Sequence, residues 1–162
     1  MPTGIIKTYY PNGILEKEYF QNNASKEGNY KLYYEDGQLF VECYYTNNKL
    51  NGKYISYYRN GNIYEISNYI NGSIDGIHKQ FYNNNELHIV CNYINGRIEG
   101  EYKEYYENQQ LKIVCNYVNG LKEKQFIKFD LSGNTQIEYY YFGRKYNKYT
   151  YWIFYTIFRC CR

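Results

Sequence analysis

Glycine recurs every 24 residues along this chain, and each of these glycines begins a near-copy of the same segment: Gly4, Gly28, Gly52, Gly76 and Gly100. A fixed period of about 20–50 residues is typical of repeat proteins, in which each unit is too small to bury its own apolar surface and packs on its neighbours. The pattern persists after the glycine is lost at Lys124 and Lys148. We therefore predict a repeat domain over residues 1–147 and a separate C-terminal segment at 148–162, with units at 4–27, 28–51, 52–75, 76–99, 100–123 and 124–147.

Each unit carries two turn signals, at positions 8–9 and 19–20 counted from its glycine as position 0. In the third unit these are Asn60-Gly61 and Asn71-Gly72. Asn-Gly is typical of a two-residue type I′ turn, which needs positive φ at both central residues. Runs rich in Tyr, Ile and Val separate the turns. The predicted fold is all-β: an elongated antiparallel β-hairpin meander with two strands per unit, forming an open sheet without helices in the repeats.

Two-residue turns fix the strand register. They predict that Tyr58 lies opposite Ile63 (positions 6 and 11) and that Tyr93 lies opposite Ile98 (positions 17 and 22). Alternation then places positions 0, 2, 6, 11, 15 and 17 on one nearly invariant face. The opposite face carries lysines at position 3 and aromatic residues at position 5. At position 0, we expect a side chain on Gly76 to crowd neighbouring rings or to force a bulged backbone.

The charge pattern argues against a nucleic-acid-binding protein. The net charge is only +3, and acidic and basic residues are interspersed. A nucleic-acid-binding domain usually shows a clustered basic face. The lysine column at position 3 is the nearest approach to one, and Lys7 and Lys31 have predicted partners in Glu18 and Glu42.

Three of the five cysteines, Cys43, Cys91 and Cys115, share position 15 on the invariant face. Equivalent residues of adjacent units lie two strands apart, about 9.5 Å at ~4.8 Å per strand. A disulfide needs Cα atoms within ~7 Å. We therefore expect small buried thiols in a reducing compartment. Because residues 1–3 show no signal peptide, we also expect a cytoplasmic location.

Residues 149–158 form an aromatic, apolar run that precedes Cys160-Cys161. The run is too short to span a bilayer, which takes about 20 residues. We expect residues 149–162 to be a hydrophobic cap over the end of the sheet or its aromatic face, and not a second domain. A lipid-modified membrane tail and the remnant of a truncated reading frame are the alternatives.

The sequence offers no catalytic, metal or cofactor site. His78 and His88 occupy positions 2 and 12, which strict alternation places on opposite faces. The acidic residues form no convergent pair, and the glycines never cluster into a phosphate-binding loop. We therefore expect no catalytic residue, no metal, no cofactor and no small-molecule substrate.

The third unit resembles the MORN repeat, in the longer variant common in bacteria and large DNA viruses. The matching residues are Gly52, Tyr54, Tyr57, Tyr58, Asn60, Gly61, Ile63, Tyr69, Asn71, Gly72 and Gly76. The resemblance covers residues 4–147, but the last unit departs from it at Lys124, Asp130, Thr135 and Gly143-Arg144. It implies a twisted antiparallel sheet that acts as a scaffold or binds partners, with phosphoinositide or membrane association in some members and antitoxin-like relatives in bacteria.

Two functional hypotheses follow. The first is a non-enzymatic scaffold that binds an unidentified protein through Tyr33, Tyr57, Phe81 and Tyr105, although these rings could equally just cover the sheet. The second is a membrane-surface adaptor that uses Lys7, Lys31, Lys79 and Lys103 together with the C-terminal tail.

Overall fold

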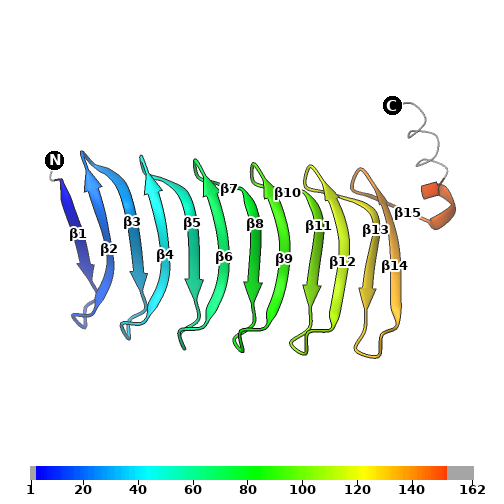
Figure 1. Cartoon of the computed structure of the whole chain (residues 1–162), viewed down its shortest axis with the longest axis horizontal. Helices are drawn as coiled ribbons and strands as arrows, with labels where there is room; N and C mark the ends of the chain where they lie inside the picture. Colours follow the sequence, from blue (N-terminus) through cyan, green and yellow to red (C-terminus); the bar gives the residue numbers. More distant parts are fainter. Residues whose placement is uncertain (1–2, 153–162) are drawn as a thin grey trace.

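The computed structural model describes residues 3–152 and forms one long antiparallel sheet in a single layer, with strands following one another in chain order (Figure 1). This confirms the predicted all-β open meander. The fifteen strands are β1 (Gly4–Tyr9), β2 (Leu15–Asn22), β3 (Ser25–Tyr33), β4 (Leu39–Thr46), β5 (Lys49–Tyr57), β6 (Ile63–Ile70), β7 (Ser73–Ile74), β8 (Gly76–Phe81), β9 (Leu87–Ile94), β10 (Arg97–Ile98), β11 (Gly100–Tyr105), β12 (Leu111–Val118), β13 (Leu121–Phe129), β14 (Thr135–Tyr141) and β15 (Arg144–Tyr146).

The second turn of each unit is the predicted two-residue type I′ turn. Asn71 and Gly72 have φ values of 52° and 88°, and the flanking Ile70 and Ser73 are paired. The expected pairing of Tyr93 with Ile98 is also present. Asparagine followed by glycine therefore sets this turn, because both residues tolerate the left-handed conformation.

The first turn differs from the prediction. Gly61 has a φ of 87°, whereas the φ of Asn60 is not positive. The amide of Gly61 donates to the carbonyl of Tyr58, and the amide of Tyr58 donates to the carbonyl of Asn62. This is a three-residue loop, a type I turn followed by a left-handed glycine. The extra loop residue moves the pairing by one, so Ile63 lies opposite Tyr57 and not opposite Tyr58.

A β-bulge then restores the expected register. Positions 12 and 13, Tyr64 and Glu65 in the third unit, both oppose Ser56 at position 4. Beyond the bulge the predicted pairs Lys7–Glu18, Lys31–Glu42 and Ile55–Ile66 are all present. The register error is therefore local: it moves the aliphatic residue at position 11 to the face that carries the aromatic residue at position 5, and it moves position 12 to the opposite face.

The sheet has two chemically distinct faces. We call the face of positions 0, 2, 4, 6, 12, 13, 15 and 17 the cysteine face, and the face of positions 1, 3, 5, 11, 14, 16 and 18 the lysine face. The column at position 15 on the cysteine face is buried in four consecutive units: Cys43, Ser67, Cys91 and Cys115. Rings at positions 2 and 17 pack over this column edge to face, as Tyr54 does with Tyr69 at 5.7 Å between centroids.

A tyrosine at position 6 joins each unit to the next. The hydroxyl of Tyr58 donates to the backbone carbonyl of Phe81 at 2.9 Å. The same bond, always to the residue 23 positions ahead, is made by Tyr10, Tyr34, Tyr82 and Tyr106. A phenylalanine could supply the ring but not the bond.

A second set of bonds links the type I′ turns. The amide of Gly72 donates to the carbonyl of Leu50 in the preceding unit at 2.7 Å. An acidic side chain at position 23 adds to this link, since Asp75 accepts a bond from the amide of Asn95 and Glu99 from that of Asn119. Neighbouring units are thus connected at both ends of their strands.

The sixth unit lacks the bulge. Phe129 pairs with Thr135 and Ile127 with Ile137 in one uninterrupted ladder. The following type I′ turn is therefore Phe142-Gly143, one residue earlier than the repeat period predicts. This one-residue deletion explains why Gly143-Arg144 stands where Asn-Gly is expected, whereas Lys124, Asp130 and Thr135 are substitutions at unshifted positions. Because of the deletion, Tyr139 pairs with Gln125 and points to the lysine face, although its spacing predicts the cysteine face.

The repeat glycines are required by backbone conformation and not by crowding. Gly76 has φ +96°, and the nearest atom to an added Cβ is the Cβ of Asn68 at 3.9 Å, an ordinary contact. The expectation of crowded rings is therefore wrong. Lys124 replaces the glycine at φ 66°, close to the left-handed region that other residues can occupy.

We predict that Gly76→Val lowers the free energy of unfolding by at least about 1 kcal/mol, because a β-branched residue is strained at this positive φ. Urea denaturation measures the change. Lys79→Val, an exposed site in the same strand, is the control and should change stability by less than about 0.5 kcal/mol. A Gly76→Val protein as stable as the control would contradict the backbone argument.

We predict that Tyr58→Phe costs about 1 kcal/mol, because it leaves the carbonyl of Phe81 without its hydroxyl donor. Tyr105→Phe is the matched control: Phe81 already occupies position 5 in the preceding unit, and the hydroxyl of Tyr105 makes no hydrogen bond among the described residues. Equal stability of the two variants in denaturant titrations would show that the inter-unit bond contributes nothing.

Candidate functional site

Three hollows lie on the lysine face, two over the first three units and one at the C-terminal end. They are built by positions 1, 3, 14 and 16 of successive units. One hollow of about 590 Å³ is lined by Asn29, Lys31, Glu42, Tyr44 and Lys53. A smaller one of about 340 Å³ shares Asn29 and Lys31 with it and adds Ile5, Glu18 and Phe20. A third, of about 350 Å³, lies over the last two units. We call these positions the central row.

Apolar side chains are exposed along the central row and beside it. Ile5 is 69% exposed and Ile77 is 60% exposed, both at position 1. Ile70 and Ile94 at position 18 are each 50% exposed. Exposed apolar side chains gathered on one face indicate an interaction surface, whereas scattered single ones do not.

The structure places the predicted aromatic residues in one line next to the central row. Tyr33, Tyr57, Phe81 and Tyr105 are half-buried, each opposite an aliphatic residue at position 11. The hydroxyl of Tyr57 donates to Glu42 at 2.6 Å, and that of Tyr33 donates to Glu18 at 3.1 Å. In these two units the rings therefore also have an intramolecular role, since each bridges to an acid of the preceding unit.

The four predicted lysines do not form a continuous basic stripe. Ile55 and Ile127 interrupt the column at position 3. Lys7 forms a salt bridge with Glu18 at 3.3 Å, and Lys103 forms one with Glu101 at 2.6 Å. Lys31 lies opposite Glu42, and Lys79 is exposed opposite Val90. Local acids thus offset the positive charge of much of the column.

The cysteine face holds a buried cluster that the sequence reading missed. Ser67 Oγ donates to Glu65 Oε1 at 2.6 Å and lies 2.8 Å from His78 Nδ1. Because the single hydroxyl proton of Ser67 goes to Glu65, Nδ1–H of His78 donates to Ser67. Burial alone would raise the pKa of Glu65, but the hydrogen bonds from His78 and Ser67 outweigh it and hold that pKa below its usual value.

This cluster does not have the geometry of a serine-hydrolase triad. In a triad, one imidazole nitrogen contacts the serine and the other contacts the acid. Here Ser67 and Glu65 both contact Nδ1, the latter at 3.4 Å. Ser67 is also only 1% exposed. The cluster is a buried network whose polar groups are hydrogen-bonded to one another. It occupies positions that hold tyrosine (position 2) and cysteine (position 15) in neighbouring units.

His88 lies on the cysteine face, which corrects the expectation that the two histidines point to opposite faces. The bulge that includes position 12 turns its side chain toward Tyr82, with ring centroids 4.2 Å apart. Its Nε2 is 3.6 Å from Glu104 Oε1, and Lys112 also contacts this carboxylate. Residues 3–152 contain no group of three potential ligands that could hold a metal ion.

The thiols at position 15 are free and buried, as predicted. Burial raises the pKa of Cys43, Cys91 and Cys115 to about 11. Such thiols remain protonated near neutral pH and are poor nucleophiles. Cys160 and Cys161 lie outside the described residues. Within residues 3–152, no helix is long and apolar enough to cross a bilayer.

The geometry defines a class: a single-layer repeat protein in which each unit of about 24 residues contributes one β-hairpin. The chain belongs to the MORN repeat variant family, whose pattern matches residues 2–23, 26–47, 50–71, 74–95 and 98–119. The sixth unit, with its deletion, falls outside these matches.

No curated protein matches the chain. One solved structure that is similar to it is the crystal structure of a GtfA/B complex bound to UDP and GlcNAc, at 10% identity and a TM-score of 0.27. The match covers 99% of this chain and 27% of the other. The chain therefore spans about a quarter of the chain it matches, and the likeness carries no functional argument.

We predict that Glu65→Gln weakens the acid sensitivity of folding. The pKa of Glu65 is lower in the folded protein than its ordinary value of 4.5. Such a carboxyl stabilises the fold at pH values above 4.5, and this stabilisation is lost as the pH falls through the lowered pKa. Unfolding free energies measured from pH 6 to pH 3 should therefore fall less steeply in the variant. A slope equal to that of the unmodified protein would contradict the role given to Glu65.

Proposed function

We propose that the protein is a non-enzymatic scaffold that binds a protein partner on its lysine face. The supporting observations are the hollows at the two ends of the central row, together with the line of half-buried aromatic rings and the exposed isoleucines beside it over several units. On the cysteine face, tyrosine rings cover the column at position 15, and the hollow on that face, about 500 Å³ beside Lys112 and Lys128, lies toward the turns of the last two units. The buried free thiols agree with a cytoplasmic location, which we include in the proposal.

The partner that suits this surface is an extended segment with alternating apolar and charged side chains. The central row offers both kinds of contact, since Ile5, Phe20 and Tyr44 lie close to Lys31 and Lys53. Rigid aromatic rings lose little conformational entropy on binding, which favours Tyr33, Tyr57, Phe81 and Tyr105 as anchors. Phe81 and Tyr105 suit this role best, because neither side chain makes a hydrogen bond among the described residues.

We predict that Phe81→Ser/Tyr105→Ser abolishes capture of the native partner from an extract, while Leu131→Ser leaves it intact. Leu131 is the control because it is 59% exposed in a turn outside the central row. Thermal melts of both variants show whether the fold is retained. Retention of the partner by a folded double variant would overturn the proposed surface.

Liposome flotation tests the membrane alternative in parallel. Because local acids offset much of the lysine column, we expect no flotation with or without anionic lipid. Flotation that needs anionic lipid, and that is lost in Lys79→Glu, would favour the adaptor hypothesis over protein binding.

A further inference from the structure

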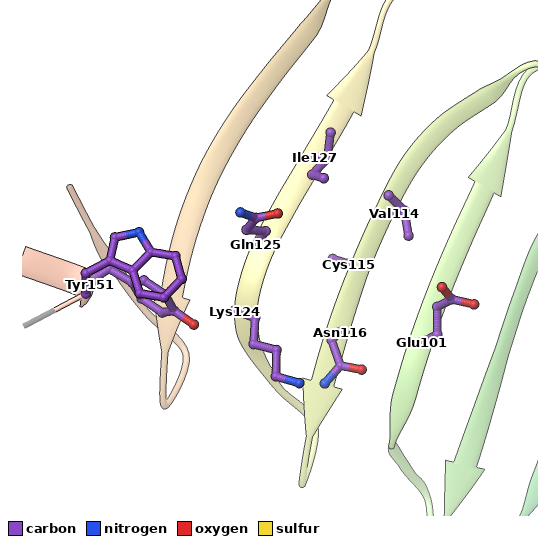
Figure 2. A pocket seen from close by; sticks show the side chains of 9 residues that line it. Glu101, Val114, Cys115, Asn116, Lys124, Gln125, Ile127 and Tyr151 are labelled. Carbon is purple, nitrogen blue, oxygen red and sulfur yellow. The ribbon is translucent and has the colours of Figure 1, made fainter. Parts of the chain in front are cut away.

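The hollow at the C-terminal end of the central row is mainly apolar. Its floor is Val114 on β12 paired with Ile127 on β13, and Glu101 and Gln125 lie at its rim. Figure 2 shows these side chains together with Tyr151, which approaches from the chain beyond β15. Trp152, the last described residue, also lines this hollow.

A short helical turn brings Tyr151 and Trp152 to this place. Residues 148–152 are helical, and Asn147 caps them by accepting bonds from the amide and hydroxyl of Thr150, each at 2.9 Å. Tyr151 is only 3% exposed and packs on Tyr139 at 5.3 Å between ring centroids. The one-residue deletion in the sixth unit is what turns Tyr139 to this face.

Two aromatic side chains of this turn are partly or largely exposed. Trp152 is 48% exposed and Tyr149 is 82% exposed. The chain continues from Trp152 with the apolar run Ile-Phe-Tyr-Thr-Ile-Phe at 153–158, followed by Arg159 and Arg162. An apolar segment that starts at the wall of an apolar hollow can bury itself there at a lower entropic cost than a free partner can.

We propose that residues 153–158 of the same chain dock in this hollow and complete the cover of the last two units on the lysine face. The reach is sufficient: six residues span up to about 20 Å at ~3.3 Å each, whereas β11 is two strand spacings, or about 10 Å, from β13. The docked segment would occupy the C-terminal end of the central row, and its docking does not depend on the proposed partner.

The native tail cysteines provide a direct test in the full chain. Glu101→Cys puts a thiol at the rim, where the native side chain is 59% exposed. Under mild oxidation we expect the monomer to form an intramolecular disulfide with Cys160 or Cys161, detected by peptide mapping. The buried thiols are protonated and should not compete.

Ile77→Cys is the matched control. Ile77 occupies the same repeat position as Glu101, is 60% exposed, and lies two strands further from the tail. It is still within the roughly 26 Å that the eight residues from Ile153 to Cys160 can span when extended. Docking predicts at least about tenfold faster cross-linking for Glu101→Cys, and none after Cys160→Ser/Cys161→Ser. Equal rates at the two sites, or disulfides only between molecules, would overturn the proposal. The latter would indicate a tail that docks on a second copy.

Discussion

Pairing between neighbouring hairpins is the interaction on which the fold depends: backbone ladders such as β4–β5 and β12–β13 cross the boundaries between units, and the hydroxyl of the tyrosine at position 6 adds a side-chain bond. This hydroxyl reaches across the boundary between units and donates to a backbone carbonyl 23 residues ahead, in five successive instances. A single-layer sheet has no second layer to pack against, so each hairpin gains most of its stability from its neighbours. This explains why position 6 is tyrosine in the first five units, whereas position 5 accepts Phe81. In the sixth unit position 6 is Asp130, whose side chain accepts bonds from the amides of its own turn.

The two faces divide structural and binding roles. On the cysteine face, small side chains at position 15 allow tyrosine rings to close over the column, and this arrangement tolerates the replacement of a tyrosine by His78 because Ser67 and Glu65 satisfy the imidazole. The lysine face has no such closed column. Its central row remains open in the N-terminal half, whereas Tyr151 closes part of it at the C-terminal end. The deletion in the last unit produces this difference, since it turns Tyr139 outward to receive Tyr151.

Much of the fold could be predicted from the sequence, because the period and the Asn-Gly turns are local signals. The type I′ turn at Asn71-Gly72 was predicted correctly. The same dipeptide at Asn60-Gly61 is compatible with a two-residue turn and with a three-residue loop, and the two give registers that differ by one residue. The unit with Asn108-Gln109 held a clue, since glutamine is a poor residue for a turn with two positive φ values. The Ser67–His78 contact could also have been predicted. Ser67 replaces the cysteine usual at position 15, His78 replaces the tyrosine usual at position 2, and these two positions face each other across adjacent strands. The central row could not be predicted, because its hollows depend on how neighbouring side chains pack and on the missing bulge after Thr135.

Native-state hydrogen exchange on the full chain measures whether units are stabilised by their neighbours on both sides. We expect the slowest exchange for amides in β5 to β9, with opening free energies that fall from unit to unit toward β1, because β1 pairs with β2 alone among the described strands. We also expect the amides of each type I′ turn that donate to the preceding unit, such as Gly72 and Gly96, to be protected with the central strands. Exchange of the first unit as slow as that of the third and fourth would show that one neighbour is enough and that the second adds no stability.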